Sequence, residues 1–244
     1  MATVNVDIKK LLEAGAHFGH KTSRWHPKMA PYIHSKREGI HIIDLTTTVA
    51  ALDEALAFLE ETAAAGKQVL IVGTKRQAKD IVKQLAEDTN MPYVSNRWLG
   101  GMLTNQNTIS GRIKHLVKLE TDMESGGLEA KYNKLELQRV QEEIELLNYQ
   151  YGGIKNMAKK PNVVFVFDVL NDANAVREAK KLNIPVVALV DTNTDPSVIN
   201  YPIPCNDDAI KTMQLIADYV KQAIEAGKAK IKKEDDKEEK GDDK

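Results

Sequence analysis

The stretch that decides the fold is "QVLIVG", residues 68–73, together with "KRQAKDIVKQLAED", residues 75–88. The first part is short, apolar and rich in β-branched residues, as expected of a strand that is buried on both faces. The second part repeats apolar residues at helical spacing, which predicts an amphipathic helix. A buried strand followed by such a helix is the building unit of a parallel α/β sheet.

The same unit recurs on both sides of this stretch. Apolar segments predict four further strands, at residues 39–45, 92–95, 162–168 and 184–191. Periodic segments predict further helices at residues 46–66, 171–183 and 206–227, and a short helix that begins at Asp7. Five strands alternating with helices predict a doubly wound parallel sheet. Residues 16–39 show no clean period and are expected to be irregular.

One segment interrupts this alternation. From about Gln106 to Gln150 the sequence favours helix, with a single break at "SGG", residues 125–127. Apolar residues recur at three- and four-residue steps on both sides of the break, which predicts an inserted antiparallel helical hairpin. Two ordinary core helices are the alternative. The charged run "KLELQRVQEEIELL", residues 134–147, favours a hairpin that protrudes into solvent.

The chain is therefore expected to divide into three parts. Residues 1–104 and 151–227 form an α/β sandwich domain, residues 105–150 form the hairpin, and residues 228–244 form a charged tail. The tail mixes seven lysines with seven acidic residues and has almost no apolar side chains, so it is predicted to be disordered.

Composition narrows the class of protein. A single cysteine, Cys205, excludes an internal disulfide and favours a reducing compartment. No segment has the apolar length of a membrane span and the N-terminus lacks a leader pattern, so we expect a cytoplasmic protein without a membrane partner. A net charge of −1 argues against nucleic-acid binding by the whole surface, yet residues 1–37 hold seven basic residues against two acidic ones.

The sequence lacks the common motifs of catalysis. The loop "GTKRQAK", residues 73–79, lies where a phosphate loop would lie, but it lacks the second glycine of the Walker pattern. No G-x-G-x-x-G, G-x-S-x-G or H-E-x-x-H pattern occurs elsewhere. We therefore expect no enzyme activity. The alternative is a stand-alone nucleotide-binding α/β enzyme or regulator.

The segment "HFGHKTSRWHPKMAPYIHSKR", residues 17–37, interleaves five lysines and arginines with three aromatic residues. Cations neutralise phosphates and flat rings stack on bases, so this pattern predicts an RNA-binding surface. A solvated basic loop is one alternative, although such loops seldom carry two prolines and three aromatic residues. A metal site at "HFGH" is another, but it lacks further ligands nearby in sequence.

A second RNA-binding segment is expected around "SNRWLGGMLTN", residues 95–105. Gly100 and Gly101 are predicted to form a turn that brings the backbone close to RNA, while Trp98 packs under the base of the hairpin. Arginine and asparagine side chains near this turn suit phosphates and sugars better than a core. The predicted RNA-binding residues are Lys21, Arg24, Trp25, His26, Lys28, Lys36, Arg37, Lys75, Arg76, Arg97, Asn105, Asn107, Arg112 and Lys114.

Three carboxylates are expected to converge at one edge of the sheet. Asp191 ends a predicted strand, and Asp207 and Asp208 open the last helix, so all three lie on the same side. Capping of that helix by Asp207 or Asp208 is the simpler explanation. Capping needs only one aspartate, however, and three carboxylates repel one another unless a cation or a basic partner compensates.

Five stretches taken together resemble a known family. In chain order they are "AGAHFGHKTSRWHPKMAPYI", "GIHIIDLTTTV", "VLIVGTKRQAK", "NRWLGGMLTN" and "PIPCNDDA". They resemble bacterial ribosomal small-subunit protein two over about residues 5–226. His26 departs from the family pattern, which more often has asparagine before "PKM". The resemblance implies a flavodoxin-like α/β/α sandwich with an inserted helical hairpin and no catalytic activity.

The resemblance also implies a location and partners. A member of this family lies on the solvent side of the small ribosomal subunit, between head and body, and binds the small-subunit RNA. It contacts neighbouring subunit proteins and helps to recruit the mRNA-binding ribosomal protein one, and it is not a homo-oligomer. The edge with Asp191, Asp207 and Asp208 would dock protein one, with these aspartates as ligands of a divalent metal such as zinc. No other cofactor is expected.

Overall fold

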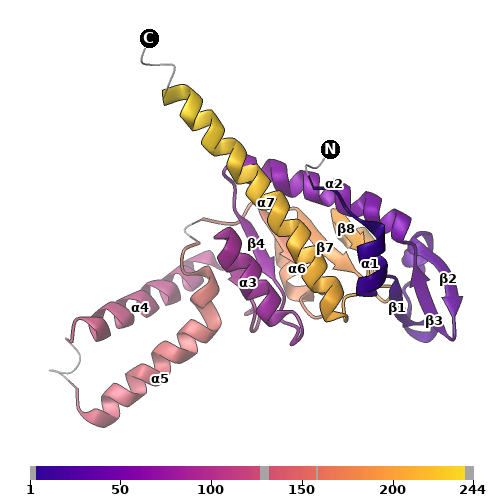
Figure 1. Ribbon diagram of the computed structural model, residues 1–244. Coiled ribbons are helices and arrows are strands. Elements are labelled where there is room, and N and C mark those ends of the chain that lie inside the picture. The colour runs from indigo at the N-terminus through magenta and orange to yellow at the C-terminus, as the bar shows by residue number, and fades with distance from the viewer. Residues whose placement is uncertain (1–3, 127–131, 158, 240–244) are drawn as a thin grey trace.

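The computed structural model describes residues 4–126, 132–157 and 159–239 and has helices on both faces of a parallel sheet (Figure 1). Five strands form this sheet in the order β5-β4-β6-β7-β8, and every neighbouring pair is parallel. In chain order they are β4 (Val69–Val72), β5 (Tyr93–Val94), β6 (Val163–Val166), β7 (Val186–Val190) and β8 (Tyr201–Pro204). The predicted α/β sandwich is confirmed.

Successive residues of a strand face opposite sides of the sheet, so each side has its own core. Val69 and Ile71 pack with helices α1 (Ile8–Ala14), α2 (Leu45–Ala64), α3 (Lys79–Thr89) and α7 (Ile210–Glu239). Leu70 and Val72 pack with α6 (Ala173–Lys181) and with the root of the hairpin. Burial of one such side chain stabilises the fold by about 1.5–3 kcal/mol. The continuous apolar strands are therefore the strongest fold signal in the sequence.

The inserted hairpin consists of α4 (Gln106–Glu124) and α5 (Lys134–Tyr151), and it projects away from the sheet (Figure 1). Its predicted apolar seams face inward, and Leu116 and Leu147 are buried. The side chain of Asn133 accepts hydrogen bonds from the backbone N–H groups of Leu135 and Glu136, so α5 begins with a capping box. The one-turn helix η3 (Gly152–Ile154) then leads the chain back toward the sheet.

Residues 16–39 are regular rather than irregular, which corrects the prediction. Strands β1 (Phe18–Lys21), β2 (Ile33–Arg37) and β3 (Ile40–Ile43) form a separate antiparallel sheet in the order β1-β3-β2. The short helices η1 (Thr22–Arg24) and η2 (Pro27–Tyr32) connect β1 to β2. The prediction that residues 39–45 belong to the parallel sheet is wrong. In β3 only alternate residues are buried, as expected of a sheet with one solvated face.

The fifth parallel strand is β8, which the sequence pattern does not reveal. Pro202 and Pro204 lie in it, and proline weakens a strand because it lacks a backbone N–H. β8 is an edge strand, and an edge tolerates proline on the side that has no neighbour. The short helix η4 (Pro196–Val198) precedes it.

Helix α7 continues into the segment that is predicted to be disordered. It ends at Glu239, and Lys228 Nζ donates a hydrogen bond to the carbonyl oxygen of Thr89. Lysine, glutamate and alanine are good helix formers, so a helix anchored on the core can propagate into this segment. α7 thus extends past the predicted boundary at residue 227, and residues 240–244 of the predicted tail lie outside the described residues. Neither α7 nor any other described helix has the length and apolar character needed to cross a membrane.

Candidate RNA-binding and protein-docking surfaces

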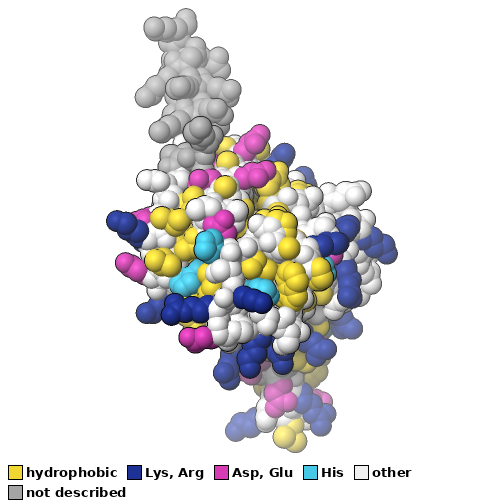
Figure 2. Space-filling model, turned by 90° about the vertical axis from the view of Figure 1, so that its right-hand side faces the viewer, with side chains coloured by type: hydrophobic (Ala, Val, Ile, Leu, Met, Phe, Trp, Pro, Cys, Tyr) yellow, Lys and Arg dark blue, Asp and Glu magenta, His cyan; other side chains and the backbone are white. Residues whose placement is uncertain are grey.

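The basic residues of the N-terminal segment lie on the antiparallel sheet and its connections. We define the N-terminal basic surface as Lys21, Arg24, Lys28, Lys36 and Arg37, which are all exposed. Figure 2 views the molecule from this side and shows lysine and arginine side chains around apolar and histidine side chains. Trp25 is 39% exposed, and its ring is tilted over that of His41 with the centroids 5.2 Å apart. Cations and an accessible aromatic ring are thus presented together.

The backbone of this segment is attached to the parallel sheet at Thr192, which follows β7. The Thr192 carbonyl oxygen accepts a hydrogen bond from His26 N at 2.7 Å, and its Oγ1 accepts one from His20 N at 2.8 Å. Gly19 makes this approach possible, because a Cβ there would lie 2.6 Å from Thr192 Cγ2. The glycine of "HFGH" therefore serves close packing.

Lys28 differs from the other cations because it already has partners within the protein. Its Nζ donates to Asp195 Oδ2 at 2.8 Å and to Ser197 Oγ at 2.6 Å. Hydrogen bonds from Lys28 and then from Ser197 hold the pKa of Asp195 well below its ordinary value. His26 Nδ1 accepts a hydrogen bond from Lys28 N at 3.3 Å and so caps η2. Lys28 and His26 therefore stabilise the segment and are only partly available to RNA.

The stretch "NRWLGGMLT", residues 96–104, wraps around a carboxylate of the protein itself. Glu178 of α6 accepts hydrogen bonds at Oε1 from Trp98 Nε1 at 3.0 Å and from Gly101 N at 2.7 Å. Its Oε2 accepts bonds from the N–H groups of Leu103 and Thr104 and from the Thr104 hydroxyl, each at 3.0 Å. Although burial opposes the charge, these donors lower the pKa of Glu178. Five donors on one carboxylate fix the hairpin root to α6.

Gly101 serves the Glu178 contact, because its N–H group donates to this carboxylate, and the predicted approach of the turn to RNA stays a prediction. Gly101 has φ +91°, a left-handed conformation that residues with a Cβ rarely adopt. A Cβ at Gly100 would meet nothing within 4 Å, so that position does not require glycine for space. Trp98 is 8% exposed and packs in the core under the hairpin, as the sequence predicts.

Polar residues around the hairpin root face solvent. We define the hairpin-root surface as Arg97, Asn105, Asn107, Arg112 and Lys114, which are all exposed. Figure 1 places α4 and the antiparallel sheet at opposite ends of the molecule. The two predicted RNA-binding segments thus lie on two separate surfaces. The predicted residue Arg76 follows β4 and is also exposed.

The carboxyl ends of the parallel strands bring several aspartates together around Lys75. Lys75 Nζ lies 3.0 Å from Asp168 Oδ2, 3.1 Å from Asp207 Oδ1 and 2.7 Å from Asp208 Oδ1. Asp207 N lies 3.5 Å from Asp191 Oδ2, so the three aspartates that the sequence places at one edge do converge. We define the acidic edge as His20, Lys75, Asp168, Asp191, Asp207 and Asp208.

His20 joins this edge from β1. Its Nδ1 lies 3.1 Å from Asp191 Oδ2, and its Nε2 lies 3.4 Å from Asp208 Oδ2. The hydrogen bond with Asp191 raises the pKa of His20 although partial burial opposes this. One imidazole therefore connects the antiparallel sheet to two carboxylates of the parallel sheet.

Burial makes the charges of the acidic edge interdependent. Desolvation, followed by the nearby Asp168 and Asp191, raises the pKa of Asp207 to about 7, and Lys75 offsets this only in part. Burial opposes the charge of Lys75, but the aspartates around it raise its pKa. The hydrogen bond from Lys75 lowers the pKa of Asp208. The edge holds more negative charge than one lysine balances, so the pKa of Asp207 lies above its ordinary value.

Two expectations about this edge need correction. Lys75 is predicted to face RNA, but its side chain is 17% exposed and is held by three carboxylates. The helix cap expected of Asp207 or Asp208 belongs instead to Asn206. Its Oδ1 accepts hydrogen bonds from Asp208 N at 2.8 Å and from Ala209 N at 3.1 Å as the chain enters α7.

The residues of this edge that could hold a metal ion overlap with the predicted set. His20, Asp191 and Asp207 each offer an atom that lies within 4.8 Å of the others, and the predicted set has Asp208 instead of His20. One imidazole and two carboxylates are acceptable zinc ligands. The "HFGH" motif carries a sequence signal for His20, but its partners lie more than 170 positions away in the chain and only the fold brings them close.

The chain is similar to known proteins over most of its length. Residues 11–227 match the family model described as "Ribosomal protein S2". The chain is 48% identical to "Small ribosomal subunit protein uS2" of Coprothermobacter proteolyticus over 91% of this chain and 83% of that protein. It is 47% identical to the protein of that name from Picosynechococcus sp. over 91% and 87% of the two chains. The corresponding protein of Roseiflexus sp. is 50% identical over 91% and 84%.

Replacing Glu178 with alanine should loosen the hairpin root, because five donors lose their acceptor. We expect the free energy of unfolding to fall by about 2–4 kcal/mol, since hydrogen bonds to a charged group contribute about 1.5–3 kcal/mol each and water replaces part of the loss. Hydrogen exchange should increase at Gly101, Leu103 and Thr104 before it increases in the sheet. Glu142→Ala, on the exposed face of α5, is the control. Unchanged exchange in Glu178→Ala would contradict the clamp.

The contribution of Asp207 and His20 to stability should fall as pH rises from about 4 through about 7. A carboxyl whose pKa is raised on folding, such as Asp207, binds a proton in the folded state that the unfolded chain has released. His20 acts in the same direction, because its stabilisation is present below its unfolded pKa and is lost as pH rises through its raised folded pKa. Burial also raises the pKa of Asp172, to about 6, which adds to the trend.

Chemical denaturation at several pH values measures this dependence. Asp207→Asn should flatten the fall in part, whereas Asp218→Asn on the exposed side of α7 should keep the slope of the parent. The parent slope in Asp207→Asn would show that Asp207 does not hold a proton in the folded state.

Proposed function

This chain belongs to the ribosomal protein S2 family, and from that premise we propose that it binds small-subunit RNA through two basic surfaces and docks a protein at its acidic edge. Family membership makes it a structural constituent of the small ribosomal subunit in the cytoplasm, rather than an enzyme. Its partners are accordingly ribosomal RNA and neighbouring subunit proteins. Such a role needs no cofactor.

The N-terminal basic surface supports the RNA proposal most directly. Lys21 precedes η1 and Arg24 ends it. Lys36 and Arg37 end β2, so folded elements fix the spacing of these charges. Cations held in place can contact successive phosphates at a smaller entropic cost than cations on a flexible loop. Trp25 adds an accessible ring on which a base can stack.

The hairpin-root surface is proposed as the second RNA contact. Arg112 and Lys114 lie on the first half of α4, where they extend beyond the sheet. Asn105 and Asn107 offer amides of the kind that contact phosphates and sugars. The Glu178 clamp fixes the direction in which this helix leaves the body, so the two basic surfaces keep a defined separation.

A nucleotide-binding enzyme is a poor alternative for a physical reason. Enzymes with open parallel sheets bind phosphates at the carboxyl ends of the strands. In this protein those ends carry four aspartates. Lys75, which lies at the phosphate-loop position, forms ion pairs with three of them. A phosphate placed there would face net negative charge.

The acidic edge suits a cation and a protein partner, which we propose to be ribosomal protein one. Burial and the nearby Asp168 and Asp191 raise the pKa of Asp207 to about 7, and Lys75 offsets this only in part. A divalent ion such as zinc would bind His20, Asp191 and Asp207 and add the positive charge that this edge lacks. Three protein ligands leave a coordination position for a group of the partner. The ion would thereby join the two proteins.

The RNA proposal predicts a change in salt dependence. Replacing Arg24, Lys36 and Arg37 together with alanine should reduce the slope of log affinity for small-subunit RNA against log salt by about three, because each phosphate contact contributes about one unit. Filter binding over a salt series measures the slope. Lys9, Lys10 and Lys67 are exposed elsewhere, and their triple alanine variant removes the same charge as a control. Equal slopes in both variants and the parent would refute binding through this surface.

The docking proposal predicts selective loss of one subunit protein. Asp191→Asn combined with Asp208→Asn should leave this protein on the small subunit but reduce the amount of protein one there. Quantitative mass spectrometry of purified subunits compares the two proteins directly. Glu54→Gln combined with Asp218→Asn removes two exposed carboxylates elsewhere and is the matched control. Parental occupancy of protein one in the Asp191/Asp208 variant would leave the edge with a purely structural role.

A further inference from the structure

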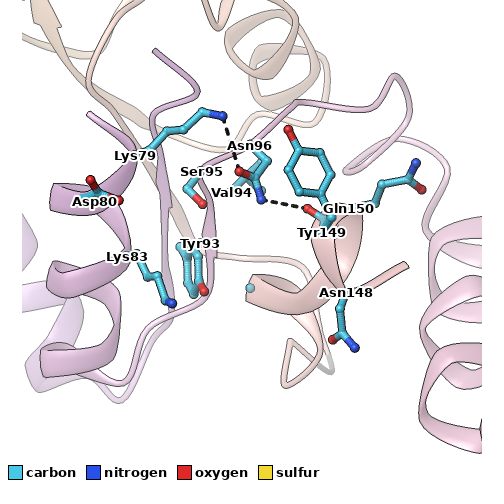
Figure 3. A pocket seen from close by; sticks show the side chains of 11 residues that line it. Lys79, Asp80, Lys83, Tyr93, Val94, Ser95, Asn96, Asn148, Tyr149 and Gln150 are labelled. Atoms are coloured by element: carbon cyan, nitrogen blue, oxygen red, sulfur yellow. Dashed lines mark hydrogen bonds between the residues drawn. The ribbon is translucent and has the colours of Figure 1, made fainter. Parts of the chain in front are cut away.

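A polar cavity of about 320 Å³ lies between the hairpin root and the edge of the parallel sheet. Figure 3 shows Lys79 and Lys83 of α3 on one side of it, and Tyr149 and Gln150 at the end of α5 on the other. The chain that leaves β5 passes between these two sides. We call this cavity the hairpin-root cleft.

The two sides of the cleft are held at a fixed separation. Asn96 connects them, because Lys79 Nζ donates to its Oδ1 at 3.5 Å and its Nδ2 donates to the carbonyl oxygen of Tyr149 at 3.0 Å. Below this link, η3 packs tightly on β5: a Cβ at Gly153 would lie 2.9 Å from ring atoms of Tyr93. The cleft is therefore preformed.

The cations of the cleft are available to an anion. Lys79 Nζ is bound to an amide oxygen through a long hydrogen bond. Lys83 Nζ lies 3.8 Å from Glu87 in an exposed pair one helical turn apart, and such pairs contribute little. Asp80 is the one carboxylate among the lining residues, so the two ammonium groups outweigh it.

The remaining lining residues suit a nucleobase. The amide of Gln150 offers both a donor and an acceptor, as the edge of a base requires. Tyr93 and Tyr149 bring flat rings to the cleft, and Tyr149 is 53% exposed. Pockets of about 300–1,000 Å³ typically hold small ligands, so the cleft has the size for one nucleotide.

We propose that the hairpin-root cleft binds one unpaired nucleotide of the small-subunit RNA, with its phosphate at Lys79 and Lys83 and its base against Tyr149. This inference rests on the proposed function, since it assigns RNA as the source of the nucleotide. Arg97 follows Asn96 directly and belongs to the hairpin-root surface. An RNA strand on that surface therefore passes the mouth of the cleft.

Ultraviolet cross-linking of small subunits that carry the full chain tests this proposal. Mass spectrometry should find a nucleotide attached to a peptide that contains Tyr93 or Tyr149. Tyr149→Leu should reduce the yield on the order of fivefold or more, because stacking of a base on an aromatic side chain is a large part of single-strand binding. Tyr149→Phe keeps the ring and should keep the yield. Tyr132→Leu removes an exposed tyrosine of the hairpin outside the cleft and is the matched control.

The outcomes separate this proposal from the proposed function. Cross-links confined to residues 17–37, or an unchanged yield in Tyr149→Leu, would overturn the cleft and leave RNA binding intact. Absence of the parent protein from purified subunits would overturn both.

Addition of uridine or adenosine monophosphate to the purified protein tests a free nucleotide as the source. Saturable binding that Tyr149→Leu abolishes, without any RNA cross-link at the cleft, would overturn RNA as the ligand.

Discussion

The interaction on which the rest of the structure depends is the set of ion pairs that Lys75 makes at the carboxyl ends of the parallel strands. The chain leaves β4, β6 and β8 at this edge, and these exits bring Lys75, Asp168, Asp207 and Asp208 into contact. Without the lysine, the aspartates would face one another in a partly buried place, where unpaired charge is costly. Lys75 therefore fixes the geometry of these loops as well as their charge.

The antiparallel sheet depends on the same edge. His20 reaches Asp191 and Asp208, and Thr192 receives two backbone hydrogen bonds from the N-terminal segment. At the other end of the molecule, Glu178 fixes the loop that begins the hairpin through its five hydrogen bonds. In both places a carboxylate inside the protein positions a segment whose lysines and arginines point outward. This separation explains how a chain with 34 basic and 35 acidic residues can present two basic surfaces.

The parts of the fold that follow from local pattern could be predicted from the sequence. Continuous apolar strands such as "VVFV" indicate burial on both faces, and the seams of α4 and α5 indicate a hairpin. The sequence pattern does not predict β8, because proline is unusual in a strand. Proline is tolerated in β8 because this strand lies at the edge of the sheet. The sequence pattern does not predict β1 and β2 either, because their residues are mostly polar and only partly buried.

The candidate sites also combine features that the sequence pattern predicts with features that depend on the fold. Exposure of the basic residues between 21 and 37 agrees with the sequence pattern, because charge interleaved with aromatic residues rarely enters a core. The partners of Lys75 and of the loop at Gly101 could not be predicted, because an ion pair or a backbone hydrogen bond over such a separation depends on the topology of the sheet. The sequence pattern predicts that Lys75 binds RNA and that Gly100 and Gly101 form a turn close to RNA. Lys75 and the N–H group of Gly101 each have a carboxylate of the protein as a partner.

The central claim is that Lys75 only partly neutralises a buried group of aspartates. Carbon-detected NMR titration of the Asp207 carboxyl, in the parent and in Lys75→Met, tests it most directly. The account predicts a pKa of about 7 in the parent and a higher value in the variant, because loss of the ammonium group leaves Asp168 and Asp191 to oppose ionisation of Asp207. An ordinary pKa near 3.8 in the parent, unchanged by Lys75→Met, would contradict it.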